Sequence, residues 1–316
     1  MVSIIIPTYN RAHVIEETID SIKAQTYTDW ECIIVDDGST DNTFEYLGIL
    51  LKDDDKFQIF ERPKTITKGP SACRNFAFSK VKGDYIQFFD SDDIMHPEHL
   101  KLKMDAIKQK DLVVCKLSTF SGDFNADFFL NEAVIPDIKQ PDNVFEAFVT
   151  GDFPMMMVAP LWKTECLKPY MPIREDLHIL EDHELYARAL FKNKTVAIVN
   201  QVLIYYRVGA ASSTNSFYSN VDYGLASYFE AKTTVLKLSQ ANPVKLSVLK
   251  MTLGFFRQAL AERNFNAANS CLRFVKNKKL CYNFNLKLKC LRIYFFYGIF
   301  KIIRKGDTKF KPLFKL

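Results

Sequence analysis

Apolar residues follow two alternating patterns along the first half of the chain. Short, nearly continuous apolar runs of the kind that form buried strands occur at residues 4–6, 31–35, 57–60, 85–89 and 112–115. Segments with apolar residues at helical spacing, which predict helices, cover residues 12–26, 40–51, 70–81 and 96–109. In the first of these helices the apolar positions are Ile15, Ile19 and Ile22. Such alternation predicts a mostly parallel α/β sheet with helices on both faces.

The rest of the chain has a less regular pattern. It predicts a helix over residues 143–149, core strands at 155–158 and 161–162, a helix over 181–191, and a strand pair or one long strand over 196–208. From about residue 218 the pattern is helical and basic to the end. A chain of 316 residues is longer than a single core usually supports. We therefore predict a catalytic domain at 1–214 and a helical, basic and aromatic region at 215–316.

The composition is that of an ordinary soluble protein, with 48% hydrophobic and 25% charged residues. The seven cysteines are scattered and form no C-x-x-C pair, which argues against a disulfide framework and a structural zinc site. No secretory pattern precedes the first strand, and no apolar stretch approaches the ~20 residues that cross a bilayer. Together with reduced thiols, these features predict a cytoplasmic protein.

Positive charge is concentrated in the C-terminal part. Residues 241–316 hold 17 Lys or Arg and two acidic residues, whereas the whole chain carries a net charge of only +5. Residues 284–316 are either a helical appendage that completes the core or an interfacial segment whose aromatic and basic side chains lie on anionic lipid. We favour the second, with peripheral contact at the inner face of the cell membrane. No recognised nucleic-acid-binding motif accompanies the charge, so we expect no nucleic-acid partner.

Three polar clusters directly follow predicted strands, at residues 8–10, 36–39 and 90–93. Because ligands of open α/β sheets bind beyond the carboxyl ends of the strands, the three clusters are expected to share one site. Asp90 and Asp92 supply hard carboxylate oxygens of the kind that bind Mg²⁺ or Mn²⁺ together with phosphates. A solvated acidic turn is the alternative for these two residues taken alone.

Five motifs occur together in one order along residues 1–214. They are IIIPTYNR at 4–11, VDDGSTD at 35–41, GPSACRN at 69–75, FDSDD at 89–93 and LEDHEL at 180–185. Each motif is weak alone, but the set resembles the bacterial GT-A glycosyltransferases of family 2 in order and separation. The resemblance implies a GT-A fold, which is a Rossmann-like, mostly parallel sheet flanked by helices, here with a helical basic C-terminal extension.

The resemblance also implies roles for individual residues. Asp182 would be the general base that takes a proton from the acceptor hydroxyl, with inversion at the anomeric carbon. Asp92 would bind Mn²⁺ or Mg²⁺, and Asp37 would accept a hydrogen bond from the uracil base. The residues expected to bind the nucleotide-sugar are Pro7, Thr8, Tyr9, Asp37, Arg74, Asp90, Ser91 and Arg207.

The chain departs from the family pattern at two positions. The family often has a histidine after the segment that corresponds to residues 205–208, and Gly209 stands there instead. If that histidine helps to hold metal or diphosphate, Arg207, Ser212 or Ser213 must compensate for it. The frequent asparagine two residues before the glycine of GPSACRN is Thr67 here.

The sequence as a whole predicts an inverting, metal-dependent glycosyltransferase. The implied donor is a UDP-sugar, and the acceptor is a hydroxyl of a glycan or a lipid-linked molecule in surface-polysaccharide assembly. One alternative is a sugar-1-phosphate nucleotidyltransferase, but residues 7–11 lack the glycine-rich phosphate loop that such an enzyme needs. The other is a catalytically silent sugar-nucleotide-binding protein. The missing histidine favours it, and the intact Asp92 and Asp182 count against it.

Overall fold

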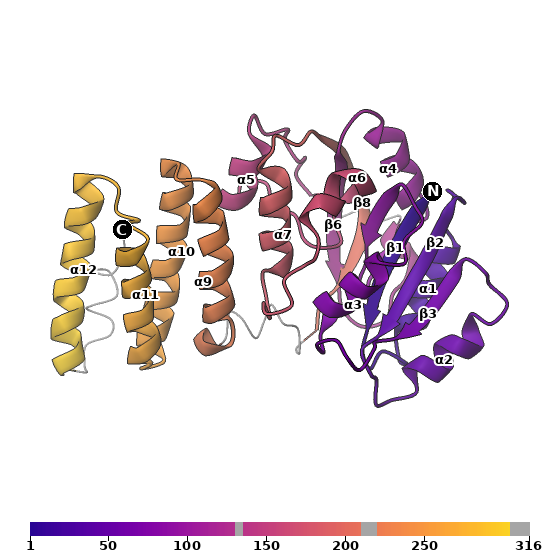
Figure 1. The fold of residues 1–316 in the computed structure, drawn as a ribbon, viewed down its shortest axis with the longest axis horizontal. Helices are drawn as coiled ribbons and strands as arrows, with labels where there is room; N and C mark the ends of the chain where they lie inside the picture. Colours follow the sequence, from indigo (N-terminus) through magenta and orange to yellow (C-terminus); the bar gives the residue numbers. More distant parts are fainter. Residues whose placement is uncertain (130–134, 210–219, 304–316) are drawn as a thin grey trace. The chain divides into compact units, whose positions relative to one another are not determined.

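The computed structural model describes residues 1–129, 135–209 and 220–303, and the chain divides into two compact units (Figure 1). The first unit comprises Met1–Phe145, Phe153–Asp176 and Glu181–Ala210. The second comprises Glu146–Asp152, Leu177–Leu180 and Ala211–Leu316. The domain boundary predicted between residues 214 and 215 lies outside the described residues.

The first unit is built on an eight-stranded sheet with the order β3-β2-β1-β4-β7-β6-β8-β5. Its strands are β1 (Val2–Thr8), β2 (Trp30–Asp36), β3 (Phe57–Glu61), β4 (Tyr85–Phe88), β5 (Ile94–Met95), β6 (Leu112–Phe120), β7 (Leu161–Lys163) and β8 (Val196–Arg207). β1 pairs in parallel with β2 and β4, β2 with β3, and β6 with β8. β7 runs antiparallel to β4 and β6, and β5 to β8. The predicted mostly parallel sheet is therefore confirmed.

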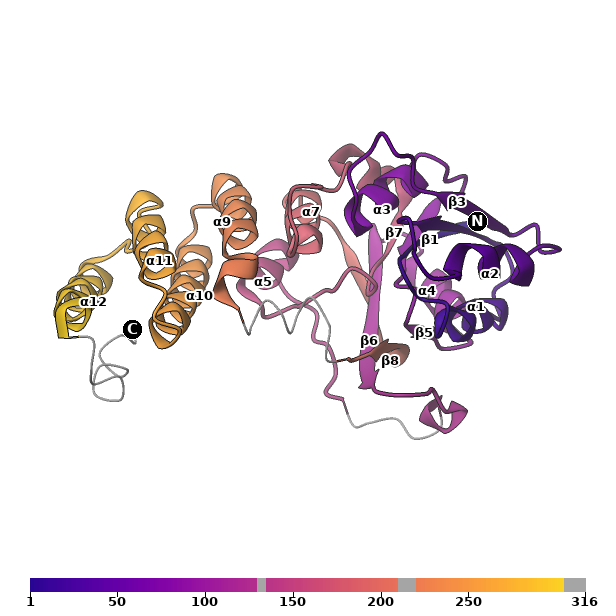
Figure 2. The same ribbon diagram turned by 90° about the horizontal axis from the view of Figure 1, so that it is seen from below.

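Helices cover both faces of this sheet. They are α1 (Ile15–Lys23), α2 (Thr43–Leu50), α3 (Pro70–Phe78), α4 (His99–Ile107), α6 (Thr164–Leu167) and α7 (Glu181–Leu190), with 3-10 turns η1 (Ala126–Phe129) and η2 (Lys168–Tyr170). α5 (Val144–Thr150) contains the point where the chain first passes into the second unit. Figure 2 shows α1, α2 and α4 on one side of the sheet and α3 on the other.

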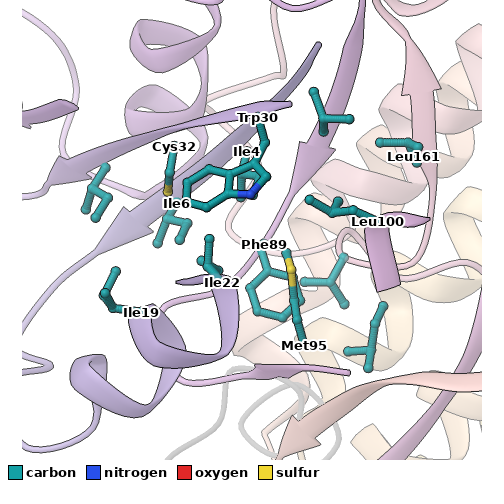
Figure 3. Packing of buried hydrophobic residues seen from close by; sticks show 14 of the residues in the cluster. Ile4, Ile6, Ile19, Ile22, Trp30, Cys32, Phe89, Met95, Leu100 and Leu161 are labelled. Carbon is teal, nitrogen blue, oxygen red and sulfur yellow. The ribbon is translucent and has the colours of Figure 1, made fainter. Parts of the chain in front are cut away.

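Alternation along the strands explains the two helical layers, because successive side chains of a strand point to opposite faces. Ile4 and Ile6 of β1 pack with Cys32 of β2 in the core cluster shown in Figure 3, which also includes apolar residues of α1, α2 and α4. Ile5 and Ile33 are equally buried and lie on the face that α3 covers. A strand with both faces buried has the continuous apolar run from which it was predicted.

Several predicted elements differ in extent. Residues 155–158 are mostly buried but form no strand. Met156 O accepts from Ala159 N–H at 3.0 Å within a turn, and the next two carbonyl groups accept from the side chains of Tyr186 and Gln87 rather than from a neighbouring strand. The helix predicted over 96–109 begins only at His99, so Pro97 lies before it. The Pro97 carbonyl instead accepts a hydrogen bond from Thr26 N–H at 2.9 Å. Residues 196–207 form one long strand, β8, rather than a pair.

The second unit is helical, as predicted from residue 218 onward. Its helices are α9 (Val221–Leu238), α10 (Asn242–Ala261), α11 (Phe265–Asn277) and α12 (Phe284–Ile303), which lie side by side in both views (Figures 1 and 2). Two segments from earlier in the chain join them: Ser247 Oγ donates to Thr150 O at 3.2 Å, and His178 N–H donates to Ser227 Oγ at 3.0 Å. Across the described ranges, no helix combines the length and apolarity needed to cross a bilayer.

Candidate active site

The loops that follow β1 and β2 are joined at the carboxyl end of the sheet. Asn10 has a left-handed backbone (φ 53°), donates from its N–H to Ser39 Oγ at 2.9 Å, and accepts from Thr40 N–H at 2.8 Å. Asp37 N–H donates to Thr8 O at 2.8 Å. These bonds place the first two predicted polar clusters side by side.

The predicted ligands at the end of β1 differ in exposure. Pro7 and Thr8 are buried, and the hydroxyl of Thr8 has no hydrogen-bond partner in the described part of the chain. Tyr9 is 38% exposed, and Lys68 Nζ lies 4.0 Å from the centre of its ring. A half-exposed ring with a cation on one face is a suitable platform for a flat, polar ligand.

Asp37 is held tightly by its neighbours. Its carboxylate is buried. Asp37 Oδ1 lies 2.5 Å from Arg62 Nε and accepts a hydrogen bond from Gly69 N–H at 3.2 Å. Arg62 directly follows β3, so the loops after β2 and β3 meet here. The carboxylate has a fixed position, which is the property that a specific hydrogen-bond acceptor needs.

Arg74 connects two further loops. Its guanidinium is 4% exposed and places Nη2 2.7 Å from Asp90 Oδ1 and Nη1 3.6 Å from Glu181 Oε1. Its Nε and Nη1 are buried and make no hydrogen bond within the described residues. A buried charge is tolerated when it is paired, and both carboxylates serve that purpose. Arg74 thereby joins the loop after β4 to the start of α7.

The acidic loop at residues 90–93 has two buried and two accessible members. The side chains of Asp90 and Asp92 are 28% and 29% exposed, whereas Ser91 is 6% and Asp93 0% exposed. Asp92 Oδ2 lies 3.3 Å from Arg11 Nη2. Burial and the charge of Asp90 raise the pKa of Asp92. The accessible pair therefore consists of like charges that a bound cation would stabilise.

Arg207 holds this acidic loop from β8. Its backbone N–H donates to Asp93 Oδ1 at 3.0 Å and its Nε to Asp92 O at 2.9 Å. Its Nη1 donates to Gly122 O, and its Nη2 lies 2.5 Å from Glu17 Oε2. Each guanidinium nitrogen of Arg207 therefore has a protein partner, and two of its contacts hold the acidic loop in position. Donor binding by Arg207 stays a prediction.

Asp182 lies in the first turn of α7, next to Glu181. Its Oδ1 accepts from His183 N–H at 2.6 Å. Burial raises its pKa, against the lowering effects of that hydrogen bond and of Arg74. Burial and the charge of Asp182 likewise raise the pKa of Glu181, to about 7. Two adjacent carboxylates beside one guanidinium form a group that can hold or release a proton near neutral pH.

The residues present fit a metal that is shared with a substrate. In residues 1–129, 135–209 and 220–303, no three His, Cys, Asp or Glu side chains gather closely enough to hold an ion by themselves. Asp90 and Asp92 offer accessible carboxylate oxygens, the donors that Mg²⁺ and Mn²⁺ prefer. Such ions are typically bound by one or two carboxylates plus phosphate oxygens, so this donor set is sufficient only together with a phosphorylated ligand.

Sequence reasoning missed several residues of this site. Arg62, Arg11 and Glu181 each pair with a predicted carboxylate or with Arg74. Burial raises the pKa of Tyr206, and the nearby charge of Asp90 raises it further. The available signal was position: Arg11 and Arg62 are charged residues just beyond strand ends. Ser212 and Ser213, predicted to compensate for the missing histidine, lie outside the described residues.

Comparisons with known sequences place this arrangement in a family. The model of glycosyl transferase family 2 matches residues 3–163. The chain is 36% identical over 114 residues to an uncharacterized glycosyltransferase of Haemophilus influenzae, covering 36% of this chain and 45% of that protein. It is 25% identical over 232 residues to the putative glycosyltransferase EpsH of Bacillus subtilis, covering 72% and 67%. This chain thus spans less than half the length of the Haemophilus relative and about two thirds of EpsH.

Solved structures are similar in fold. The S. aureus protein TarS, residues 1–349 in complex with UDP-GlcNAc, superposes with a TM-score of 0.64 at 21% identity, over 87% of this chain and 81% of that one. The mannosyltransferase PcManGT of Pyrobaculum calidifontis, in complex with GDP-Man and Mn²⁺, has a TM-score of 0.54 at 15% identity, over 99% and 83%. These likenesses confirm the GT-A fold that the five motifs implied. Since the family model covers half of the chain, this protein belongs to glycosyl transferase family 2.

Proposed function

We propose that this protein is an inverting, metal-dependent glycosyltransferase that moves a sugar from UDP to a hydroxyl of a glycan or lipid-linked acceptor in surface-polysaccharide assembly. The observation that carries the proposal is the placement of Arg74 between Asp90 and Glu181. Through it, the loop assigned to the donor and the helix that bears Asp182 meet at one point. A base beside a donor site is what transfer to a hydroxyl requires.

Asp182 is the proposed general base. A sugar hydroxyl is a poor nucleophile, and a positioned carboxylate that accepts its proton contributes about 10²–10⁴-fold to the rate. The acceptor oxygen forms a bond to the anomeric carbon while the bond from that carbon to the diphosphate breaks. The proton passes to the carboxylate of Asp182 and then to solvent. Attack from the side opposite the leaving group inverts the configuration.

The leaving diphosphate needs positive charge, and two sources are proposed. Asp92 would hold Mn²⁺ or Mg²⁺, which neutralises charge on the departing diphosphate when bound, and Asp90 would contact the sugar nucleotide. Nε and Nη1 of Arg74, which make no hydrogen bond within the described residues, would supply further N–H groups to the nucleotide-sugar. PcManGT, which shares the fold, is described in complex with Mn²⁺.

The proposal of a UDP-sugar rests on Asp37 and on one structural relative. The carboxylate of Asp37 is fixed by Arg62 and Gly69 N–H, so it would meet the N–H of a uracil base without reorganisation. Tyr9 would lie against the base, with Pro7, Thr8 and Ser91 completing the nucleotide-sugar site. TarS, which shares the fold, is described in complex with UDP-GlcNAc.

A screen of donors tests this proposal directly. In thermal unfolding with Mn²⁺ present, we expect UDP-sugars to raise the melting temperature more than GDP- or dTDP-sugars do. A ligand at 100 times its Kd adds about 2.7 kcal/mol to the free energy of unfolding. Removing the metal with a chelator should abolish most of the shift. Absence of any shift or turnover with all three donor classes, in a folded sample, would contradict the proposal and favour a catalytically silent protein.

The pH dependence of transfer should follow Asp182 and not Glu181. Asp182 must be deprotonated to act as a base, so activity should rise with pH through the raised pKa of Asp182. The charge of Asp182 helps to raise the pKa of Glu181 to about 7, so Glu181 is still neutral while Asp182 loses its proton, and Glu181→Gln should leave the rising limb of the kcat/KM profile in place. The exposed glutamate Glu165 on α6 offers a matched control, since Glu165→Gln should also leave the limb in place. A limb that moves in Glu181→Gln and stays in Glu165→Gln would contradict this order of deprotonation.

A further inference from the structure

Helix α12 exposes a row of large apolar side chains on its outer side. We call this row the outer stripe, and its members with their exposed fractions are Phe284 (80%), Leu288 (57%), Leu291 (64%), Phe295 (65%) and Ile302 (85%). At about 100° per residue, these positions fall within about 60° of one another around the helix. Soluble proteins rarely leave a contiguous apolar strip of this kind uncovered, and such strips mark interaction surfaces.

The opposite side of α12 accounts for its attachment to the second unit. Leu286, Cys290, Ile293, Tyr297 and Phe300 are buried there. Tyr297 Oη donates to Asn269 Oδ1 at 2.9 Å, and Tyr294 Oη donates to Leu272 O at 2.8 Å, so both tie α12 to α11. The outer stripe is therefore not needed to hold α12 in place, and its apolar character requires another explanation.

Basic residues border the outer stripe on both sides. Viewed down the helix axis and measured from Phe284, Lys287 and Lys301 lie about 60° and 100° away in one direction. Arg292 lies about 80° away in the other direction. All three are exposed. α12 contains no aspartate or glutamate. An apolar strip between two positive borders matches the boundary of an anionic lipid layer, where acyl chains lie beneath phosphate groups.

We propose that the outer stripe docks this protein, with α12 lying flat, on a membrane surface that contains anionic lipids. The apolar side chains enter the headgroup region, and Lys287, Arg292 and Lys301 contact lipid phosphates. Twenty residues of helix extend about 30 Å, which suits a helix lying along the surface.

A second copy of the chain is the competing occupant. The spacing of four, three, four and seven residues along the outer stripe is compatible with a coiled-coil seam. In a homodimer, however, the positions that border the seam would bring Lys287, Arg292 and Lys301 near the same basic residues of the other copy. Coiled coils use opposite charges at these borders, and α12 has no acidic residue to supply them. Charge therefore favours lipid over self-association.

Vesicle binding by the full chain tests the inference. The probes are vesicles of phosphatidylcholine alone and of phosphatidylcholine mixed with phosphatidylglycerol. Wild type should sediment with the mixed vesicles and not with phosphatidylcholine alone. The triple variant Leu288→Gln, Leu291→Gln and Phe295→Gln should weaken binding at least about tenfold, because it removes the central apolar contact. Lys287→Gln with Arg292→Gln should weaken it by about fivefold per charge and reduce its salt dependence.

Matched variants separate these effects from general surface change. Ile49→Gln removes an apolar side chain that is 78% exposed on α2 and should bind vesicles like wild type. Lys237→Gln with Lys250→Gln removes two exposed charges from α9 and α10 and should also bind normally. Equal binding by wild type and the triple variant would overturn the inference. So would a wild-type dimer, seen by light scattering, that the triple variant lacks. Neither outcome depends on glycosyl transfer, so this inference can fail while the proposed function stands.

Discussion

Replacing Asp182 with asparagine is expected to lower the rate of sugar transfer by about 10²–10⁴-fold, the usual contribution of a general base. Asparagine has nearly the shape of aspartate but cannot accept the proton of the acceptor hydroxyl. Its Oδ1 can still accept from His183 N–H, which lies 2.6 Å from Asp182 Oδ1. Because burial raises the pKa of Asp182, a neutral group should not destabilise the fold. The loss should therefore appear in kcat, with donor binding retained.

The measurement compares transfer, donor hydrolysis and donor-induced thermal stabilisation. Asp182→Asn should lose both transfer and hydrolysis, since water also needs deprotonation, while UDP-sugars still raise its melting temperature. Asp105→Asn, which changes an exposed aspartate on α4, provides the same substitution away from the site and should keep full activity. A variant at Asp182 that keeps more than about a tenth of wild-type transfer would exclude it as the base.

Much of the fold of the first unit could be predicted from the sequence, because local pattern and buried environment coincide there. β1, β2 and β4 are covered on both faces and therefore consist of nearly continuous apolar runs. The direction of each strand in the sheet could not be predicted in the same way. β7 is a three-residue strand that runs antiparallel to both neighbours, and its direction depends on partners far away in the sequence. Three of the four residues at 155–158 are buried, and their apolar composition wrongly suggested a strand.

The candidate site shows the same limit. Its acidic residues could be placed at one sheet edge, because the carboxyl ends of parallel strands share an edge. The arginines that fix those carboxylates could not be assigned. Arg207 and Glu17 are 190 residues apart, and no periodicity connects them. Arg207 is predicted to bind the donor from its place in the sequence, but its contacts with Asp92 O, Gly122 O and Glu17 become visible only in the structure. Ion pairs of this type depend on the assembled fold.

In helix α12, the apolar and aromatic pattern of the sequence arises from two sets of residues with different surroundings. Its aromatic and apolar residues include a buried set around Ile293 and an exposed set around Leu291. The two sets lie on opposite sides of the helix but have the same kinds of side chain, so composition does not separate them. Only the structure distinguishes residues that attach α12 to α11 from residues that face outward. The membrane contact predicted for residues 284–316 could therefore be narrowed to one face of one helix.

The two neighbouring aspartates of the acidic loop should respond very differently to the same substitution. Asp92→Asn removes one oxygen ligand and the negative charge from the proposed metal site, and we expect transfer to fall at least about 10²-fold, since metal stabilisation of a leaving group contributes several kcal/mol. The Mn²⁺ concentration needed for half-maximal activity should rise. Loss of the contact with Arg11 should matter little, because partly exposed ion pairs contribute about 0–1 kcal/mol.

Asp93→Asn is the matched control and should keep activity within a few-fold of wild type. Asp93 is 0% exposed, and its Oδ1 accepts from Arg207 N–H at 3.0 Å, a contact that asparagine retains. Burial, with the charge of Asp90, raises the pKa of Asp93 well above its usual range, so a neutral side chain suits the position. Metal titrations of transfer for both variants decide the assignment. An inactive Asp93→Asn beside an active Asp92→Asn would move the metal ligand to Asp93, and equal loss in both would mean that the loop acts as one unit, with no division between an accessible ligand and a buried support.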